Sequence, residues 1–165
     1  ESLHGDYTVG VLVLCNMGDP RDLRIDGMQI GRYLMPPGVN DESGGSISFV
    51  VATDAPVTAR QLNRMAKRAH LGLARAGGVV SHGSGTTTLA FSNSSDKPQI
   101  DDAHLTVLFR GVVESAEEAI INSLLGSETL SGRDGNIRHS IPPERLNDIL
   151  RVQRDALKEF SSSDK

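Results

Sequence analysis

The residue with the clearest chemical potential is Ser46, which follows the run Asn40-Asp41-Glu42-Ser43-Gly44-Gly45 and opens an apolar segment. A serine hydroxyl is a weak nucleophile at neutral pH unless a base takes its proton. If the bond between Gly45 and Ser46 were cut, Ser46 would gain an α-amine that titrates near ~7.7–8.0, which suits a general base. The two glycines would give such a cut its conformational freedom. The alternative is an ordinary turn before a strand.

A second candidate lies in the segment "SHGSGTTTLAFS", residues 81–92. Ser84 stands between Gly83 and Gly85, so its hydroxyl and nearby backbone N–H groups could hold an amine or an oxyanion. A glycine-rich β-turn with solvent-facing serines is the alternative. The segment is not a phosphate loop, because it lacks the lysine of that motif.

Asn16 ends the first apolar segment, where its amide could donate a hydrogen bond to an oxyanion or form an Asx turn. Of the histidines, only His82 adjoins a candidate residue and merits a test as a proton-transfer group. No pair has the HxxxH or HExxH spacing of a zinc site. A Ser–His–Asp triad has no supporting local motif. The five histidines are His4, His70, His82, His104 and His139.

The elements that must position these residues follow from periodicity. We predict strands at 7–15, 47–53, 86–92 and 104–113, the last bent at Gly111, and a hairpin at Asp26-Gly27. A helix begins after Thr58, which forms a capping box with Gln61, and ends at Gly77-Gly78. Further helices begin at Ser115, with Glu118 in the capping-box position, and at Pro142-Pro143. Loops or turns are expected at 36–45, 93–102 and 131–136. This order predicts one α+β domain with helices on a mostly antiparallel sheet.

The composition excludes several classes of function. The 165 residues suit one domain, and a net charge of -4 with 4% aromatic residues argues against nucleic-acid binding. No apolar run reaches transmembrane length. Cys15 is the only cysteine, so no internal disulfide or cysteine-built zinc site is expected. The polar first residues show no signal peptide, and we expect a cytoplasmic protein.

Several segments occur together in the order typical of one family. They include "YTVGVLVLCN", "GSISFVVATDAP", "LNRMAKRAHLGLARAG", "GSGTTTLAFS", "EEAIINSLLGSETLSGRDG" and "IPPERLNDIL". This series resembles the L-aminopeptidase/D-esterase family, which includes the β-peptidyl aminopeptidases, from Tyr7 to about Leu150. The resemblance implies a four-layer α/β/β/α sandwich, shared with ornithine acetyltransferases, of which this chain supplies the C-terminal portion. It also implies self-cleavage between Gly45 and Ser46, with residues 1–45 ending the α subunit and 46–165 forming the β subunit.

The resemblance also assigns roles to single residues. Ser46 matches the nucleophile, Asn16 the side-chain donor of the oxyanion hole, and Ser84 the second serine, which orients the nucleophile's amine. Gly85 and Thr86 are expected to support this network. The family has an acid where Thr86 stands, so Thr86 can form hydrogen bonds but brings no charge.

The predicted function is a self-processing serine aminopeptidase that acts on short peptides, β-peptides or amino-acid amides and esters through an acyl-enzyme on Ser46. No metal or organic cofactor is expected. The expected partners are small substrates, the remaining α-subunit-like polypeptide and further αβ units of a homo-oligomer, with neither nucleic acid nor membrane. The alternatives are an amidase or acyl transferase for substrates without a free amine, suggested by Thr86, and a non-catalytic homologue.

Overall fold

A three-stranded sheet forms the centre of the computed structural model, which describes residues 7–34, 45–96 and 100–163. Its strands are β1 (Val9–Asn16), β4 (Ser46–Thr53) and β5 (Gly85–Ser92), in the order β1-β4-β5. β1 is antiparallel to β4, but β4 is parallel to β5. The central sheet is therefore mixed, with one antiparallel and one parallel pair, rather than mostly antiparallel. Strands β4 and β5 are joined by a helix, and such a crossover returns the chain to the same end of the sheet.

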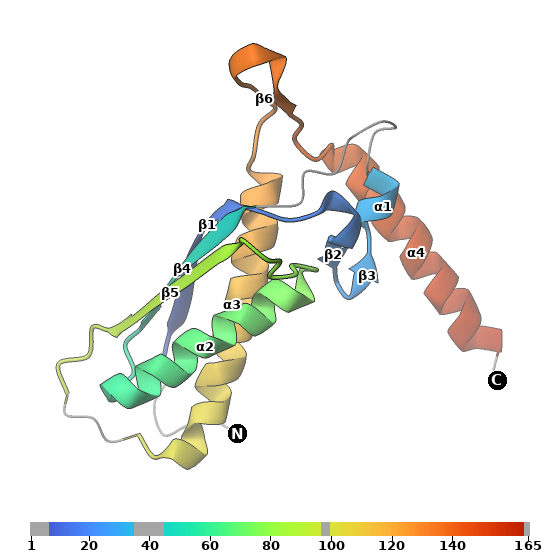
Figure 1. Ribbon diagram of the computed structural model, residues 1–165. Helices are drawn as coiled ribbons and strands as arrows, with labels where there is room; N and C mark the ends of the chain where they lie inside the picture. Colours follow the sequence, from blue (N-terminus) through green and yellow to red (C-terminus); the bar gives the residue numbers. More distant parts are fainter. Residues whose placement is uncertain (1–6, 35–44, 97–99, 164–165) are drawn as a thin grey trace.

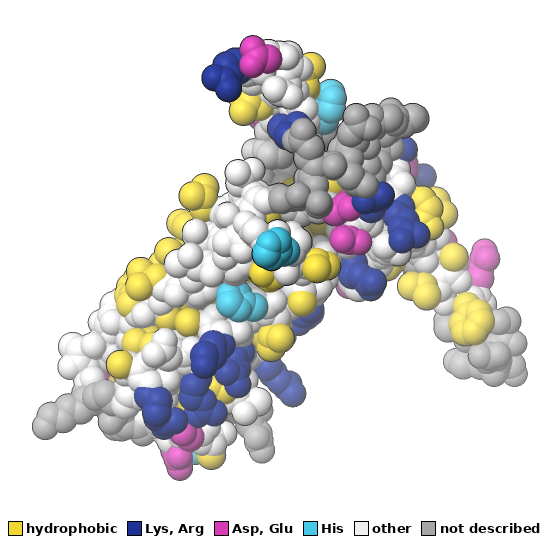
Figure 2. All heavy atoms as spheres, viewed as in Figure 1, with side chains coloured by type: hydrophobic (Ala, Val, Ile, Leu, Met, Phe, Trp, Pro, Cys, Tyr) yellow, Lys and Arg dark blue, Asp and Glu magenta, His cyan; other side chains and the backbone are white. Residues whose placement is uncertain are grey.

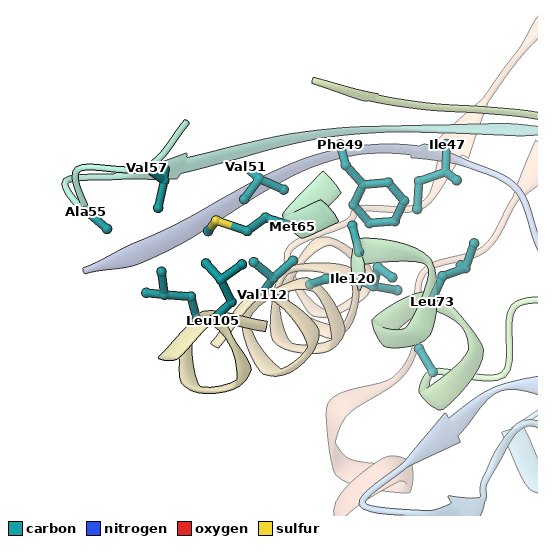
Figure 3. Packing of buried hydrophobic residues seen from close by; sticks show 14 residues of the cluster. Ile47, Phe49, Val51, Ala55, Val57, Met65, Leu73, Leu105, Val112 and Ile120 are labelled. Atoms are coloured by element: carbon teal, nitrogen blue, oxygen red, sulfur yellow. The ribbon is translucent and has the colours of Figure 1, made fainter. Parts of the chain in front are cut away.

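Two long helices, α2 (Ala59–Arg75) and α3 (Leu105–Leu125), cover one face of this sheet (Figure 1). Alternate residues of β4 point toward the helices, where Ile47, Phe49 and Val51 are at most 2% exposed. Figure 3 shows these side chains meeting residues of both helices in a single hydrophobic core. Because side chains of a strand alternate between faces, this packing leaves the other half of each strand on the opposite face.

The start and end of α2 confirm the capping signals in the sequence. The Thr58 hydroxyl accepts a hydrogen bond from the Gln61 N–H, and the Gln61 side chain accepts one from the Thr58 N–H. The helix ends before Gly77, whose φ of +92° suits glycine. Within the helix, Gly72 allows a close approach to α3. A Cβ there would lie 2.6 Å from the Val113 carbonyl oxygen.

Helix α3 corrects another prediction. Residues 104–113 were expected to form a strand bent at Gly111, but Leu105–Leu125 is one continuous helix. A short 3-10 turn, η2 (Asp102–His104), leads into it, and the Asp101 carboxylate accepts a hydrogen bond from the Ala103 N–H. Ser115, predicted to begin the second helix, therefore lies inside α3.

A smaller hydrophobic cluster joins the segment from Leu23 to Leu34 to the last helix, beside the main body (Figure 1). The predicted hairpin is confirmed as β2 (Arg24–Ile25) and β3 (Met28–Gln29), turning through Asp26 at φ +56° and Gly27 at φ +73°. Leu146 of the last helix packs in this cluster. The other elements are η1 (Pro20–Asp22), α1 (Gly31–Leu34), β6 (Leu130–Ser131), η3 (Arg133–Gly135), β7 (Ile137–Arg138) and α4 (Pro143–Ser163).

The second face of the three-stranded sheet, here called the open face, is not covered by the described residues. Leu12 and Leu14 of β1 are 64% and 72% exposed, and Leu89 of β5 is 60% exposed. Figure 2 shows exposed hydrophobic side chains along the strands. Strands β1 and β4 thus face the hydrophobic core on one side only. The open face consists of Gly10, Leu12, Leu14, Asn16, Ser46, Ser48, Val50, Ala52, Gly85, Thr87, Leu89 and Phe91.

None of the helices in the described ranges has the combination of length and apolar character needed to span a membrane. The predicted loop at 36–45 lies outside the described residues, with the exception of Gly45. The middle of the predicted loop at 93–102 also lies outside them. The turn predicted at 131–136 is present and connects β6 to β7.

Candidate active site

The sheet register brings three of the predicted site residues into one row. Ser46 begins the central strand, with Asn16 as its partner on β1 and Gly85 as its partner on β5. All three are exposed on the open face, at the end of the sheet where β1 ends and β4 and β5 begin. Residues 30 or more positions apart in the sequence are therefore neighbours at this end.

Two hydrogen bonds converge on the peptide bond between Gly45 and Ser46. The Ser84 hydroxyl donates to the Gly45 carbonyl oxygen over 2.5 Å. The Gly85 N–H donates to the Ser46 hydroxyl oxygen over 3.2 Å. The carbonyl that a nucleophile would attack and the hydroxyl that would attack it are thus each held by a donor from the same short segment.

Gly45 has no room for a side chain. Its φ is +127°, in a region that favours glycine. A Cβ there would lie 1.9 Å from the Asn16 carbonyl oxygen and 2.7 Å from the Met17 Cα. Glycine therefore permits both the backbone conformation and the close contact with the end of β1.

Ser84 is positioned by a tight turn. Its N–H donates to the Ser81 carbonyl oxygen over 3.0 Å, and Gly83 within the turn has a φ of +84°. The glycine-rich turn considered as an alternative is therefore present, and its last residue also donates to Gly45. His82 is exposed on this turn, and its ring makes no hydrogen bond with the described residues.

Asn16 presents its amide at the open face. Its side chain forms no hydrogen bond within the described part of the chain, so the Asx turn considered as an alternative is not formed there. The amide is left available to a ligand near Ser46. The register places the Cα atoms of Asn16 and Ser46 opposite each other.

Thr86 lies on the opposite face of the sheet from Ser46. It pairs with Ile47, which points into the core between sheet and helices. Its hydroxyl is buried and makes no hydrogen bond with any described residue. A buried hydroxyl without a partner costs free energy, on the order of 1–3 kcal/mol in proteins. Where the family resemblance implies an acid, the structure therefore has an uncharged group that has no partner among the described residues.

The electrostatics of the site are simple, because none of the open-face residues carries a charge. Away from these residues, Asp102 at the start of η2 has a clear pKa shift. Hydrogen bonds from Arg60 and Gln61 hold the pKa of Asp102 below its usual value of 3.8. Among the described residues, no cluster of three or more His, Cys, Asp or Glu side chains could hold a metal ion.

The sequence reasoning missed two hydroxyls beside this row. Ser48 and Thr87 occupy the next open-face positions on β4 and β5 and are partners in the register. The signal that would have found them is alternation, since residues two apart on a strand share a face.

Comparison with known proteins gives consistent matches over most of the chain. The model of peptidase family S58 matches residues 1–138. A β-peptidyl aminopeptidase of Sphingosinicella xenopeptidilytica is 38% identical over 172 residues, which cover 89% of this chain and 43% of that protein. The chain thus spans less than half the length of the curated relatives it matches.

Solved structures agree in fold. A protein of Pyrococcus horikoshii has a TM-score of 0.79 and 45% identity, covering 89% of this chain and 43% of that chain. The L-aminopeptidase D-Ala-esterase/amidase of Ochrobactrum anthropi has a TM-score of 0.78 and 31% identity, covering 89% and 44%. It is described as a variant of the Ntn hydrolase fold, so the chain shares its fold with part of a serine aminopeptidase. The predicted fold class is thereby confirmed, and the described residues supply one helical layer and one sheet layer.

Proposed function

The chain belongs to peptidase family S58, and on this premise we propose that it carries the nucleophile of a serine aminopeptidase that cuts itself between Gly45 and Ser46. The pair of hydrogen bonds at this peptide bond is the observation that carries the proposal. One donor faces the Gly45 carbonyl oxygen and the other faces the Ser46 hydroxyl oxygen.

The cut begins as an N-to-O acyl shift. The Ser46 hydroxyl oxygen attacks the Gly45 carbonyl carbon, and negative charge develops on the carbonyl oxygen, where the Ser84 hydroxyl already donates. Such a preorganised donor lowers the barrier because it stabilises the charge of the transition state. The C–N bond then breaks, the serine proton ends on the leaving nitrogen, and an ester joins Gly45 to the Ser46 oxygen. Water hydrolyses the ester to the Gly45 carboxylate and a free Ser46 amine.

Turnover reuses the same atoms. The α-amine of Ser46, with an ordinary pKa near ~7.7–8.0, removes the proton of the Ser46 hydroxyl, which attacks the substrate carbonyl. Asn16 donates to the oxyanion, and Ser84 orients the amine. The amine or alcohol of the substrate leaves with a proton, and water resolves the acyl-enzyme. The support for these roles is the row Asn16–Ser46–Gly85 and the exposure of all three residues.

The substrates proposed for the whole protein are small peptides, amides and esters with a free amino end. The relatives named as β-peptidyl aminopeptidases and an L-aminopeptidase D-Ala-esterase/amidase support this class. The exposed leucines of the open face support an assembly in which the remaining α-subunit-like polypeptide covers this face.

A second candidate is supported by Thr86. The family resemblance implies an acid at position 86, whereas the Thr86 hydroxyl that stands there is uncharged and has no hydrogen-bonding partner among the described residues. This favours an amidase or acyl transferase that accepts substrates without a free amine. Kinetics on matched amides with free and acetylated amino ends separate the two, and a preference for the acetylated series would reject the aminopeptidase.

Denaturing mass spectrometry of the full-length protein tests the cut. We expect two fragments that meet at Gly45 and Ser46, and an intact chain for Ser46→Ala, which lacks the attacking oxygen. Ser123→Ala is the matched control, because its hydroxyl bonds within α3 to the Ile120 carbonyl oxygen. An intact wild-type chain in an assembled and active protein would contradict self-cleavage.

A further inference from the structure

Ser48 and Thr87 form a second row of hydroxyls on the open face, next to Ser46. They are partners in the parallel β4–β5 pair, and Leu14 is the partner of Ser48 on β1. Both side chains are exposed. Neither hydroxyl makes a hydrogen bond within the part of the chain that the structure describes. The sheet thus presents two adjacent hydroxyls one step away from the nucleophile.

The remaining rows of the open face have a different character. Leu12, Val50 and Leu89 form the next row, and Gly10, Ala52 and Phe91 form the last. These rows suit packing against another apolar layer. A hydroxyl covered by such a layer costs free energy unless it has a hydrogen-bonding partner. The two hydroxyls occur only where the face adjoins Ser46, so their partner should be sought at the active site.

We propose that Ser48 and Thr87 bind the side chain of the substrate's acyl residue and select one that carries a neutral hydrogen-bonding group. This inference rests on the proposed function, because it needs an acyl group on Ser46. It adds a specificity-determining pair to the nucleophile, the oxyanion donor and the orienting serine.

The distances in a strand fit this role. Residues two apart on a strand are about 6.6 Å apart along its axis. A hydroxyl on the β carbon of an acyl residue lies roughly 3 to 4 Å from the acyl carbon, and a hydrogen bond adds about 2.8 Å. A seryl, threonyl or asparaginyl group on Ser46 therefore reaches the Ser48–Thr87 row, whereas an acyl group without a side chain does not.

The chemistry of the row selects for neutral polar groups. Each hydroxyl both donates and accepts, so the pair can bind a hydroxyl or a carboxamide. A charged side chain would prefer an opposite charge, and the open face has none. An apolar side chain of the same size would leave both hydroxyls without partners in the bound complex.

The test compares the kcat/KM values of the full-length protein on isosteric substrate pairs. Threonyl and valyl p-nitroanilides form one pair, and seryl and 2-aminobutyryl p-nitroanilides form the other. We expect the hydroxyl-bearing member to be preferred by about 10-fold, because two neutral hydrogen bonds each contribute a factor of roughly 2 to 12. The double variant Ser48→Ala with Thr87→Val should bring the ratio close to one.

Two controls separate hydrogen bonding from general damage to the sheet. Thr88→Val changes the same residue type on the same strand as Thr87→Val. The Thr88 hydroxyl, however, lies on the helix-covered face of the sheet, 3.4 Å from the His70 ring nitrogen. The ratio of kcat/KM values for each substrate pair should therefore stay at the wild-type value in this variant. Thr87→Ser keeps the hydroxyl and should retain most of the preference.

The outcomes distinguish this inference from the proposed function. A wild-type protein that hydrolyses all four substrates without preferring the hydroxyl-bearing ones overturns the inference and leaves the function standing. A wild-type preference that persists unchanged in the double variant also overturns it. If the assembled protein hydrolyses none of the four substrates, the result refutes both the proposed function and this inference.

Discussion

Gly45→Ala is the sharpest perturbation of the candidate site, because the change adds one methyl group beside the bond that is proposed to break. The new Cβ would lie 1.9 Å from the Asn16 carbonyl oxygen, while real Cβ atoms essentially never approach closer than 3.0 Å. The end of β1 or the residue itself must therefore move by about 1.1 Å. Alanine also resists the φ of +127°, a strain of order 1–3 kcal/mol.

The expected result follows from the contact that this movement disturbs. The Gly45 carbonyl oxygen accepts its hydrogen bond from Ser84, and a misplacement of about 1 Å costs around 10²-fold in rate. We therefore expect the fragments to appear at least about 10²-fold more slowly than in the wild type. Time-resolved denaturing mass spectrometry after synthesis in a cell-free system measures this rate.

Gly18→Ala is the matched control for backbone strain. Gly18 has a φ of +110°, but no atom lies within 4 Å of its ideal Cβ. This variant should lose stability by a similar strain and still cut at a rate within about threefold of the wild type. If Gly45→Ala cuts as fast as the control, the contact with Asn16 does not position the carbonyl, and the reasoning is refuted.

Three further predictions concern the donor, the helix pair and one ion pair. Ser84→Ala removes the donor to the Gly45 carbonyl, so the cut should slow by about 10²–10³-fold in the same assay, and an unchanged rate would exclude that donor. Gly72→Ala should lower the free energy of unfolding by about 1–3 kcal/mol in urea denaturation, because its Cβ overlaps the Val113 carbonyl. Gly111→Ala, with its nearest contact at 3.5 Å, should be neutral or stabilising by up to about 1 kcal/mol, and equal losses in both variants would contradict the argument. The pKa of Asp102 lies below 3.8 in the folded state, so its contribution is present above that pH and is lost as the pH falls through the folded-state pKa. Urea denaturation across the acidic range should accordingly show a shallower loss of stability for Asp102→Asn, and identical pH profiles would contradict the assignment.

The elements that the sequence predicted correctly have local signals that the tertiary structure does not override. Thr58 and Gln61 form the predicted capping box, and Asp26-Gly27 forms the predicted hairpin turn. These arrangements depend on residues three or fewer positions apart. Local chemistry alone determines them, so a single sequence suffices.

The first half of α3 was predicted wrongly because two local signals were followed instead of the helical spacing of its apolar residues. Residues 104–113 are rich in β-branched and aromatic side chains, which favour a strand. The buried positions, however, are Leu105, Leu108, Val112, Ala116 and Ile120, which follow the spacing of a helix. The Ser115–Glu118 pattern resembles a capping box, but both residues lie inside α3 and do not mark the start of a helix.

The parallel pairing of β4 and β5 could have been predicted from the order of elements. A 17-residue helix lies between the two strands, and parallel strands need such a crossover connection. The members of the candidate site could be named from the sequence, but their arrangement could not be predicted from it. The face of the sheet on which Thr86 lies depends on the register between β5 and β4. Register is a property of strand pairing rather than of local sequence.

The position of Ser46 at the head of the central strand has a consequence for how the pieces of a cut chain would behave. β1 precedes the cut and β4 follows it, yet eight register pairs from Val9–Thr53 to Asn16–Ser46 join them. Separating the pieces would require pulling an edge strand from the sheet and exposing the core beneath it. The two polypeptides would therefore remain a single folded body, and its native mass would exceed that of the uncut chain only by the added water molecule. The new amine would also appear already in place between Asn16 and Gly85, so maturation would need no docking step.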